Sequence, residues 1–85
     1  MVASRTEALM AEEFATEVVK RFTGEIASRL GKASALATTA QTLNSQGLAD
    51  HAFEALMDVE PLIFETTALL NAASIVNRKE GTLGG

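Results

Sequence analysis

Asn44-Ser45-Gln46-Gly47 decides the fold, because it places the turn formers Asn44 and Ser45 and a glycine between two long helical patterns. Apolar residues recur at steps of three and four on either side of it, from Met10 to Leu43 and from Leu48 to Ala73. Neither side shows the alternation of a β-strand. We therefore predict an all-α fold, a long antiparallel helical hairpin with a helix over about 4–44, a turn at 44–47, a second helix over about 48–79 and a tail over 80–85.

The first helix has a clear start. Ser4 and Glu7 stand three residues apart as in a capping box, in which each side chain accepts a hydrogen bond from a free backbone N–H. Opposite charges at i and i+4 stabilise an exposed helix by about 0.2–0.5 kcal/mol per pair. Two such pairs are predicted, Glu17–Arg21 and Glu25–Arg29.

Gly31 and Pro61 are the two positions at which a helix of the hairpin can break or kink. Gly31 is a candidate helix end, but the apolar phase continues through it, which favours one continuous helix. Pro61 lacks the N–H that would bond to the Met57 carbonyl, so the second helix either kinks there or restarts with Asp58 as its N-cap. The unbroken apolar phase favours the kink. If both positions break the chain, the alternative is a compact three- or four-helix monomer.

The length of the chain allows one helical domain, residues 1–85. A domain this small needs an additional stabilising factor, such as disulfides, a metal or self-association. A chain of this length buries only about 60% of its unfolded surface, and the absence of cysteine removes the disulfide route. A metal is hard to assemble with His51 as the only histidine. Self-association is the remedy that is left, so we predict a homo-oligomer, with a two-fold dimer favoured.

Charge and hydropathy argue against two classes of partner. A net charge of −4 does not supply the basic stripe of a nucleic-acid binder. No uncharged stretch reaches the roughly 18 apolar residues of a membrane-spanning helix, and the second helix is acidic, unlike basic helices that lie on membranes. Glu7, Glu12 and Glu13 stand where a signal peptide would be apolar. We expect a cytoplasmic protein that binds neither nucleic acid nor membrane.

Two helices alone form a thin layer that leaves apolar side chains uncovered. Within the hairpin, Ala52, Leu56 and Val59 are expected to pack alongside the small residues of 33–40. The uncharged run 66–77 is apolar around much of its circumference, which is typical of a helix buried on more than one side. Pairing two hairpins into a four-helix bundle would cover it. The residues predicted at that interface are Phe14, Phe22, Phe64, Leu69, Leu70, Ala73, Ile75 and Val76.

His51, Glu54 and Asp58 share one side of the second helix and are the candidates for a metal site. Their order is His-x-x-Glu, whereas di-iron bundles use Glu-x-x-His. A solvated acidic face explains these residues, so we expect no metal and no cofactor. The chain also has no nucleophile elbow and no phosphate-binding glycine loop, which argues against enzymatic activity.

These observations favour a non-enzymatic helical module for protein–protein interaction or oligomerisation, such as a scaffold, a regulator or a small chaperone. The alternative is a helical bundle that binds a metal or small ligand through His51 and nearby carboxylates. Metal content of the purified protein separates the two hypotheses, because stoichiometric iron, manganese or zinc would contradict the first.

Overall fold

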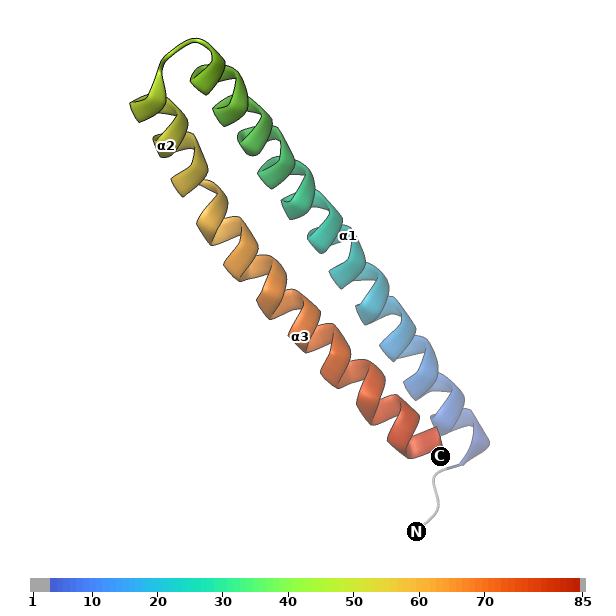
Figure 1. The fold of residues 1–85 in the computed structure, drawn as a ribbon. Coiled ribbons are helices and arrows are strands. Elements are labelled where there is room, and N and C mark those ends of the chain that lie inside the picture. Colours follow the sequence, from blue (N-terminus) through green and yellow to red (C-terminus); the bar gives the residue numbers. More distant parts are fainter. Residues whose placement is uncertain (1–3, 85) are drawn as a thin grey trace.

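The computed structural model describes residues 4–84, with side chains described as far as Asn77. This part of the chain forms α1 (Arg5–Ser45), α2 (Ala49–Met57) and α3 (Val59–Gly84). α2 and α3 follow one another along a single arm that lies antiparallel to α1, with the turn at one end and both termini at the other (Figure 1). The molecule measures 66 × 15 × 14 Å. The predicted all-α hairpin is therefore confirmed.

The turn is a Schellman-type helix end. The Leu48 N–H donates to the Leu43 carbonyl at 2.9 Å, and the Gly47 N–H donates to the Asn44 carbonyl at 3.0 Å. These bonds satisfy carbonyls that the end of α1 would otherwise leave free. Gly47 has a φ of 77°, a left-handed conformation that glycine adopts without steric cost. The chain therefore reverses tightly into α2.

The start and middle of α1 agree with the sequence pattern. Ser4 Oγ accepts from the Glu7 N–H at 3.1 Å, and Glu7 Oε2 accepts from the Ser4 N–H at 3.3 Å. The predicted capping box is thus present. α1 continues through Gly31 without a break. The compact alternative, which required a break at Gly31, is therefore excluded.

The ion pairs along α1 match the prediction in one of two cases. Glu25 pairs with Arg29 at the i,i+4 spacing. Glu17 pairs instead with Lys20, at 3.7 Å and i,i+3, rather than with Arg21. Both side chains of this second pair are highly exposed, and residues three and four apart are both within reach on a helix surface.

Asp58 interrupts the second arm between α2 and α3. Its φ of −71° and ψ of −15° stay near the helical region, and its N–H donates to the Glu54 carbonyl at 3.3 Å. Pro61 lies in the first turn of α3, where an N–H has no partner within the helix in any case. The arm consequently continues in the same direction across Pro61 (Figure 1).

The far end of α3 differs from the expected tail. The backbone is helical as far as Gly84, whereas the sequence predicts a tail over 80–85. The side chains beyond Asn77, and residue 85 as a whole, lie outside the described part of the chain.

The two arms meet along a regular coiled-coil contact, which we call the inner seam. Its residues recur at alternating steps of three and four, the spacing of a heptad repeat. All of them are buried or half-buried. The inner seam consists of Ala15, Val19, Phe22, Ile26, Arg29, Ala33, Leu36, Ala40 and Leu43 on α1, and of Ala52, Ala55, Val59, Leu62, Thr66, Leu69, Ala73 and Val76 on α2 and α3.

Small side chains hold the inner seam together. The fully buried residues in the described part of the chain are all alanine, and no large side chain there is completely enclosed. Three of them, Ala40, Ala52 and Ala55, cluster near the turn with Leu43 packed against them. Thr66 is compatible with the seam because its hydroxyl donates to the Leu62 carbonyl at 2.7 Å. The arms therefore pack closely at the alanines, and the larger side chains of the seam are only half-buried.

Arg29 is the charged member of the inner seam. Its side chain is only 25% exposed, and its Nε lies 3.5 Å from Glu65 Oε1 on the opposite arm. Its Nη1 donates to Glu25 on its own helix. Arg29 and Glu65 are equally far from Gly47 along the chain, so residues at equal distances from Gly47 lie level with each other on the two arms.

The expected packing of the second arm against α1 is met at Ala52 and Val59 and not at Leu56. Leu56, predicted to face α1, is 42% exposed, whereas the neighbouring Ala55 is 9% exposed. Alanine at this position lets the backbones approach more closely than leucine would, and close packing favours it. The apolar residues of the second arm thus form two rows, one buried against α1 and one exposed beside it.

Candidate interaction surface

The inner seam separates two long flanks of opposite character. In an antiparallel pair of helices, the positions that border the seam on one side of the first helix share a face with the equivalent positions of the second. The charged flank includes Val18, Arg21, Glu25 and Lys32 of α1 with His51, Glu54, Asp58 and Glu65 of the other arm, together with small uncharged residues and, near the termini, Phe14 and Ile75. On the apolar flank the bordering positions are Thr16, Lys20, Thr23, Ala27, Leu30, Ser34, Ala37 and Gln41 of α1 with Phe53, Leu56, Glu60, Ile63, Thr67, Leu70 and Asn77.

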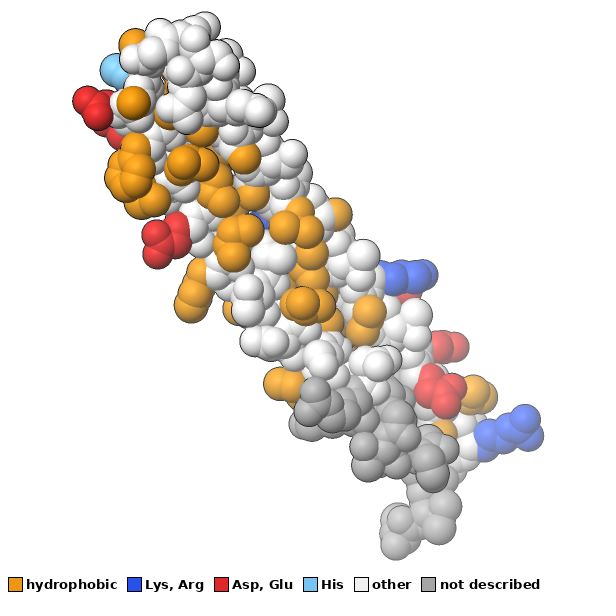
Figure 2. Space-filling view, in the orientation of Figure 1, with side chains coloured by type: hydrophobic (Ala, Val, Ile, Leu, Met, Phe, Trp, Pro, Cys, Tyr) orange, Lys and Arg blue, Asp and Glu red, His pale blue; other side chains and the backbone are white. Residues whose placement is uncertain are grey.

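The apolar flank exposes large hydrophobic side chains. Figure 2 shows hydrophobic groups running along both arms on one face, with charged groups mainly towards its margins. The exposed fractions are 46% for Leu30, 42% for Leu56, 46% for Ile63, 59% for Leu70 and 60% for Phe53. A contiguous apolar surface of this kind on a single chain usually marks an interaction site.

The exposed surface of the whole chain is large for its mass. It measures 6568 Å², whereas a compact monomer of this size exposes about 4,900 Å². The radius of gyration is 19.3 Å, against about 12 Å for a compact domain of this length. The hairpin alone therefore leaves uncovered an apolar area that a compact fold would bury.

The residues predicted at an interface fall into two groups. Phe14, Phe64, Leu70 and Ile75 are exposed, by 72%, 75%, 59% and 52%. Phe22, Leu69, Ala73 and Val76 are half-buried members of the inner seam, and they pack against the other arm. The prediction omitted Leu30, Phe53, Leu56 and Ile63, although the seven-residue spacing of Leu56, Ile63 and Leu70 was available as a signal.

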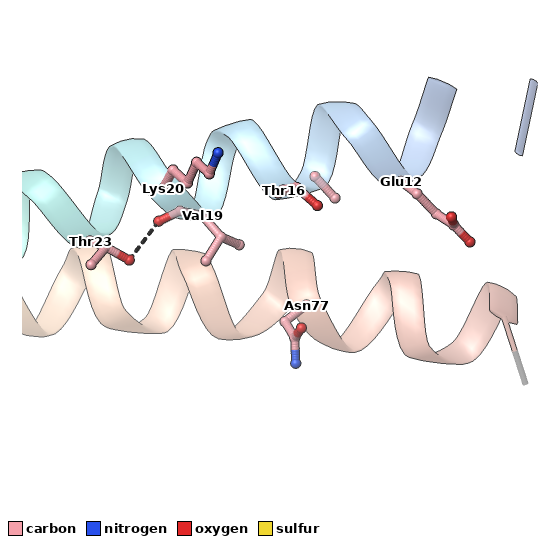
Figure 3. Close-up of a pocket in the computed structure, with 7 residues that line it drawn as sticks. Glu12, Thr16, Val19, Lys20, Thr23 and Asn77 are labelled. Carbon is pink, nitrogen blue, oxygen red and sulfur yellow. Dashed lines mark hydrogen bonds between the residues drawn. The ribbon is translucent and has the colours of Figure 1, made fainter. Parts of the chain in front are cut away.

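A groove of about 540 Å³ lies between the arms near the termini, at the end of the apolar flank. It is formed mostly by α1, with Asn77 contributing from α3 (Figure 3). The Thr23 hydroxyl donates to the Val19 carbonyl at 2.8 Å, which satisfies it within α1. The lining residues are Glu12, Ala15, Thr16, Val19, Lys20, Thr23 and Asn77.

The metal candidates lie elsewhere. His51, Glu54 and Asp58 are exposed on the charged flank near the turn, away from this groove. Among the residues with described side chains, no group of three or more His, Asp or Glu is placed to hold a metal ion. The structure therefore offers the ligand-binding alternative no assembled donor set within that part of the chain.

Electrostatics on the charged flank centre on Arg29. Its hydrogen bond to Glu25, and then its positive charge, lower the pKa of Glu25 below the usual range. The same hydrogen bond raises the pKa of Arg29. Arg29 also faces Glu65 on the other arm through its Nε, which is screened from water and makes no hydrogen bond.

One helical segment, Ala49–Asn77, is long and apolar enough to cross a membrane by length and composition alone. The segment contains five acidic residues, Asp50, Glu54, Asp58, Glu60 and Glu65, and no Lys or Arg.

Comparison of the chain with family models, curated proteins and solved structures finds no match. The proposed function therefore rests on the geometry of the apolar flank.

Proposed function

We propose that this chain is a non-enzymatic module for protein–protein association that works by burying its apolar flank against another helical surface, giving a four-helix bundle dimer. The observation that carries the proposal is the distribution of side-chain sizes: the buried residues of the hairpin are alanines, while many of its large apolar side chains, among them Phe53, Leu56, Ile63 and Leu70, are exposed. Fully burying one such side chain contributes about 1.5–3 kcal/mol. Association recovers this stabilisation for a hairpin whose own core is small.

The dimensions of the flank support a stable complex. The positions of the apolar flank on α1 run from Thr16 to Gln41, about 38 Å at 1.5 Å per residue, and the hairpin backbone is 15 Å across. Side chains widen this face, so a second hairpin on it buries an area approaching the roughly 800 Å² per partner of stable protein–protein interfaces. A stable complex is therefore compatible with the available surface.

A protein surface suits this flank better than a lipid bilayer. The α2–α3 arm carries five carboxylates between Asp50 and Glu65. Each acidic group placed in the hydrocarbon region costs on the order of 2.5–3.5 kcal/mol, and anionic membrane surfaces repel it. In a bundle, the carboxylates of the charged flank stay in water.

Light scattering across concentrations up to about 100 µM tests the proposal at typical micromolar affinities. We expect a mass near twice the 9.0 kDa of one chain. A monomer throughout this range would overturn the proposal, as would flotation of the protein with lipid vesicles. Stoichiometric metal in protein purified without added metal would instead support the ligand-binding alternative.

A further inference from the structure

We infer that the apolar flank binds a second copy of this chain in parallel, with both turns at the same end and each α2–α3 arm packed on α1 of the other copy. The inference rests on the proposed function and specifies its partner and geometry. It follows from three properties of the side chains on this flank: their sizes, their heights along the hairpin and their charges.

The two halves of the apolar flank are complementary in size. On α2 and α3 the exposed positions carry large residues, including Leu56, Ile63 and Leu70. On α1 the equivalent positions are mostly small, including Thr23, Ala27, Ser34 and Ala37; Leu30, about level with Ile63, is the large apolar exception. Knobs-into-holes packing favours large side chains opposite small ones, because helix spacing then stays even.

The large residues of one arm and the small residues of the other also lie at matching heights along the hairpin. Residues equally far from Gly47 lie at one height, as the Arg29–Glu65 contact shows. By this measure Leu56 is level with Ala37 and Leu70 with Thr23, each within about one residue, or ~1.5 Å. A two-fold axis along the hairpin keeps every height unchanged. Each leucine of one copy then meets the small residue of the other at the same level.

The antiparallel arrangement fits less well. It places α1 on α1 and α3 on α3, so large side chains meet large ones and small meet small. The two helix pairs would then need different separations within one bundle. It also displaces the copies along their length, because the large residues are centred near Ile63 and not at the middle of the hairpin.

Polar groups on the flank allow it to be buried. The Thr23 hydroxyl is already satisfied by the Val19 carbonyl (Figure 3), so burial leaves it with a partner. Lys20 and Glu60 are the charged residues among the positions that define the apolar flank. The acids of the other flank point away from the second copy. Parallel packing therefore does not bring the acidic arms into direct repulsion.

A single cysteine in the turn tests the orientation, because the chain contains none. Gln46→Cys carries a spin label at an exposed position, and electron paramagnetic resonance measures the distance between the two labels of a dimer. Parallel packing places them within about 20 Å, whereas antiparallel packing separates them by more than about 40 Å. A dimer with the long distance would overturn this inference and leave the proposed function standing; a monomer would overturn both.

A matched pair of substitutions on α1 tests the contact itself. Ala37 and Ala35 are both exposed, but Ala37 lies on the apolar flank and Ala35 lies off it. Ala37→Phe should weaken dimerisation at least tenfold, because it fills the space for Leu56 of the second copy. Ala35→Phe should leave the dissociation constant within about twofold. Circular dichroism confirms that both variants keep their helices, and equal dissociation constants would overturn the inferred contact.

Discussion

The charged and the apolar flanks of this hairpin border the same inner seam, yet only one of them is suited to remain in water. On the charged flank, Arg29 joins Glu25 and Glu65 in an ion-pair cluster. On the apolar flank, Leu56, Ile63 and Leu70 are exposed at seven-residue intervals. The difference supports the proposal that the inner seam folds the chain and that the apolar flank serves association. Substitutions at the inner seam and on each flank test this distinction.

The largest effect is expected at the seam. Ala52 is 1% exposed, and Ala52→Leu would force the arms apart at their closest packing. Overpacking of this kind costs about 1–3 kcal/mol, which urea unfolding measures. Ala68→Leu, at an exposed position of the same arm, is the control and should change stability by less than about 0.5 kcal/mol. Equal losses in the two variants would contradict the assignment of the inner seam.

An intermediate effect is expected on the apolar flank. Leu70→Asp should weaken association by at least about 2 kcal/mol, through lost apolar burial and a buried charge. Light scattering should then report a monomer at concentrations where the unchanged protein is a dimer. Ala68→Asp adds the same charge two residues away, off the apolar flank, and should leave the mass unchanged. Dissociation of both variants would point to net charge as the cause.

The smallest effect is expected on the charged flank and depends on pH. Arg29 lowers the pKa of Glu25, mainly through their hydrogen bond, from a usual value of 4.5. The unfolded chain therefore takes up this proton first as pH falls. The pair's contribution to stability is present above about 4.5 and disappears as pH falls through the lower folded pKa.

Urea midpoints measured between pH 6 and about 3 check this expectation. Glu25→Gln should flatten the acid-side decline, and Arg29→Gln should do so too, because either change removes the hydrogen bond. The dimer mass should be unaffected in Glu25→Gln. A decline as steep as in the unchanged protein would show that the pair does not contribute.

Local signals in the sequence determined most of the backbone. The Ser4–Glu7 capping box starts α1, and the Asn44–Gly47 break ends it with glycine in a left-handed conformation. Periodicity carried α1 through Gly31. Each of these features depends on residues within one or two helical turns, so a sequence pattern suffices to predict them.

Only the tertiary structure decided which side chains of the second arm pack against α1. Ala55 and Leu56, Leu62 and Ile63, and Leu69 and Leu70 are adjacent apolar pairs, so periodicity alone cannot say which member faces α1. The first member of each pair belongs to the inner seam, because there alanines on both arms permit the closest approach. That choice exposes Leu56, Ile63 and Leu70 and thereby creates the apolar flank. The sequence determined that two long helices pair, and contacts across the arms decided which large side chains remained exposed on the apolar flank.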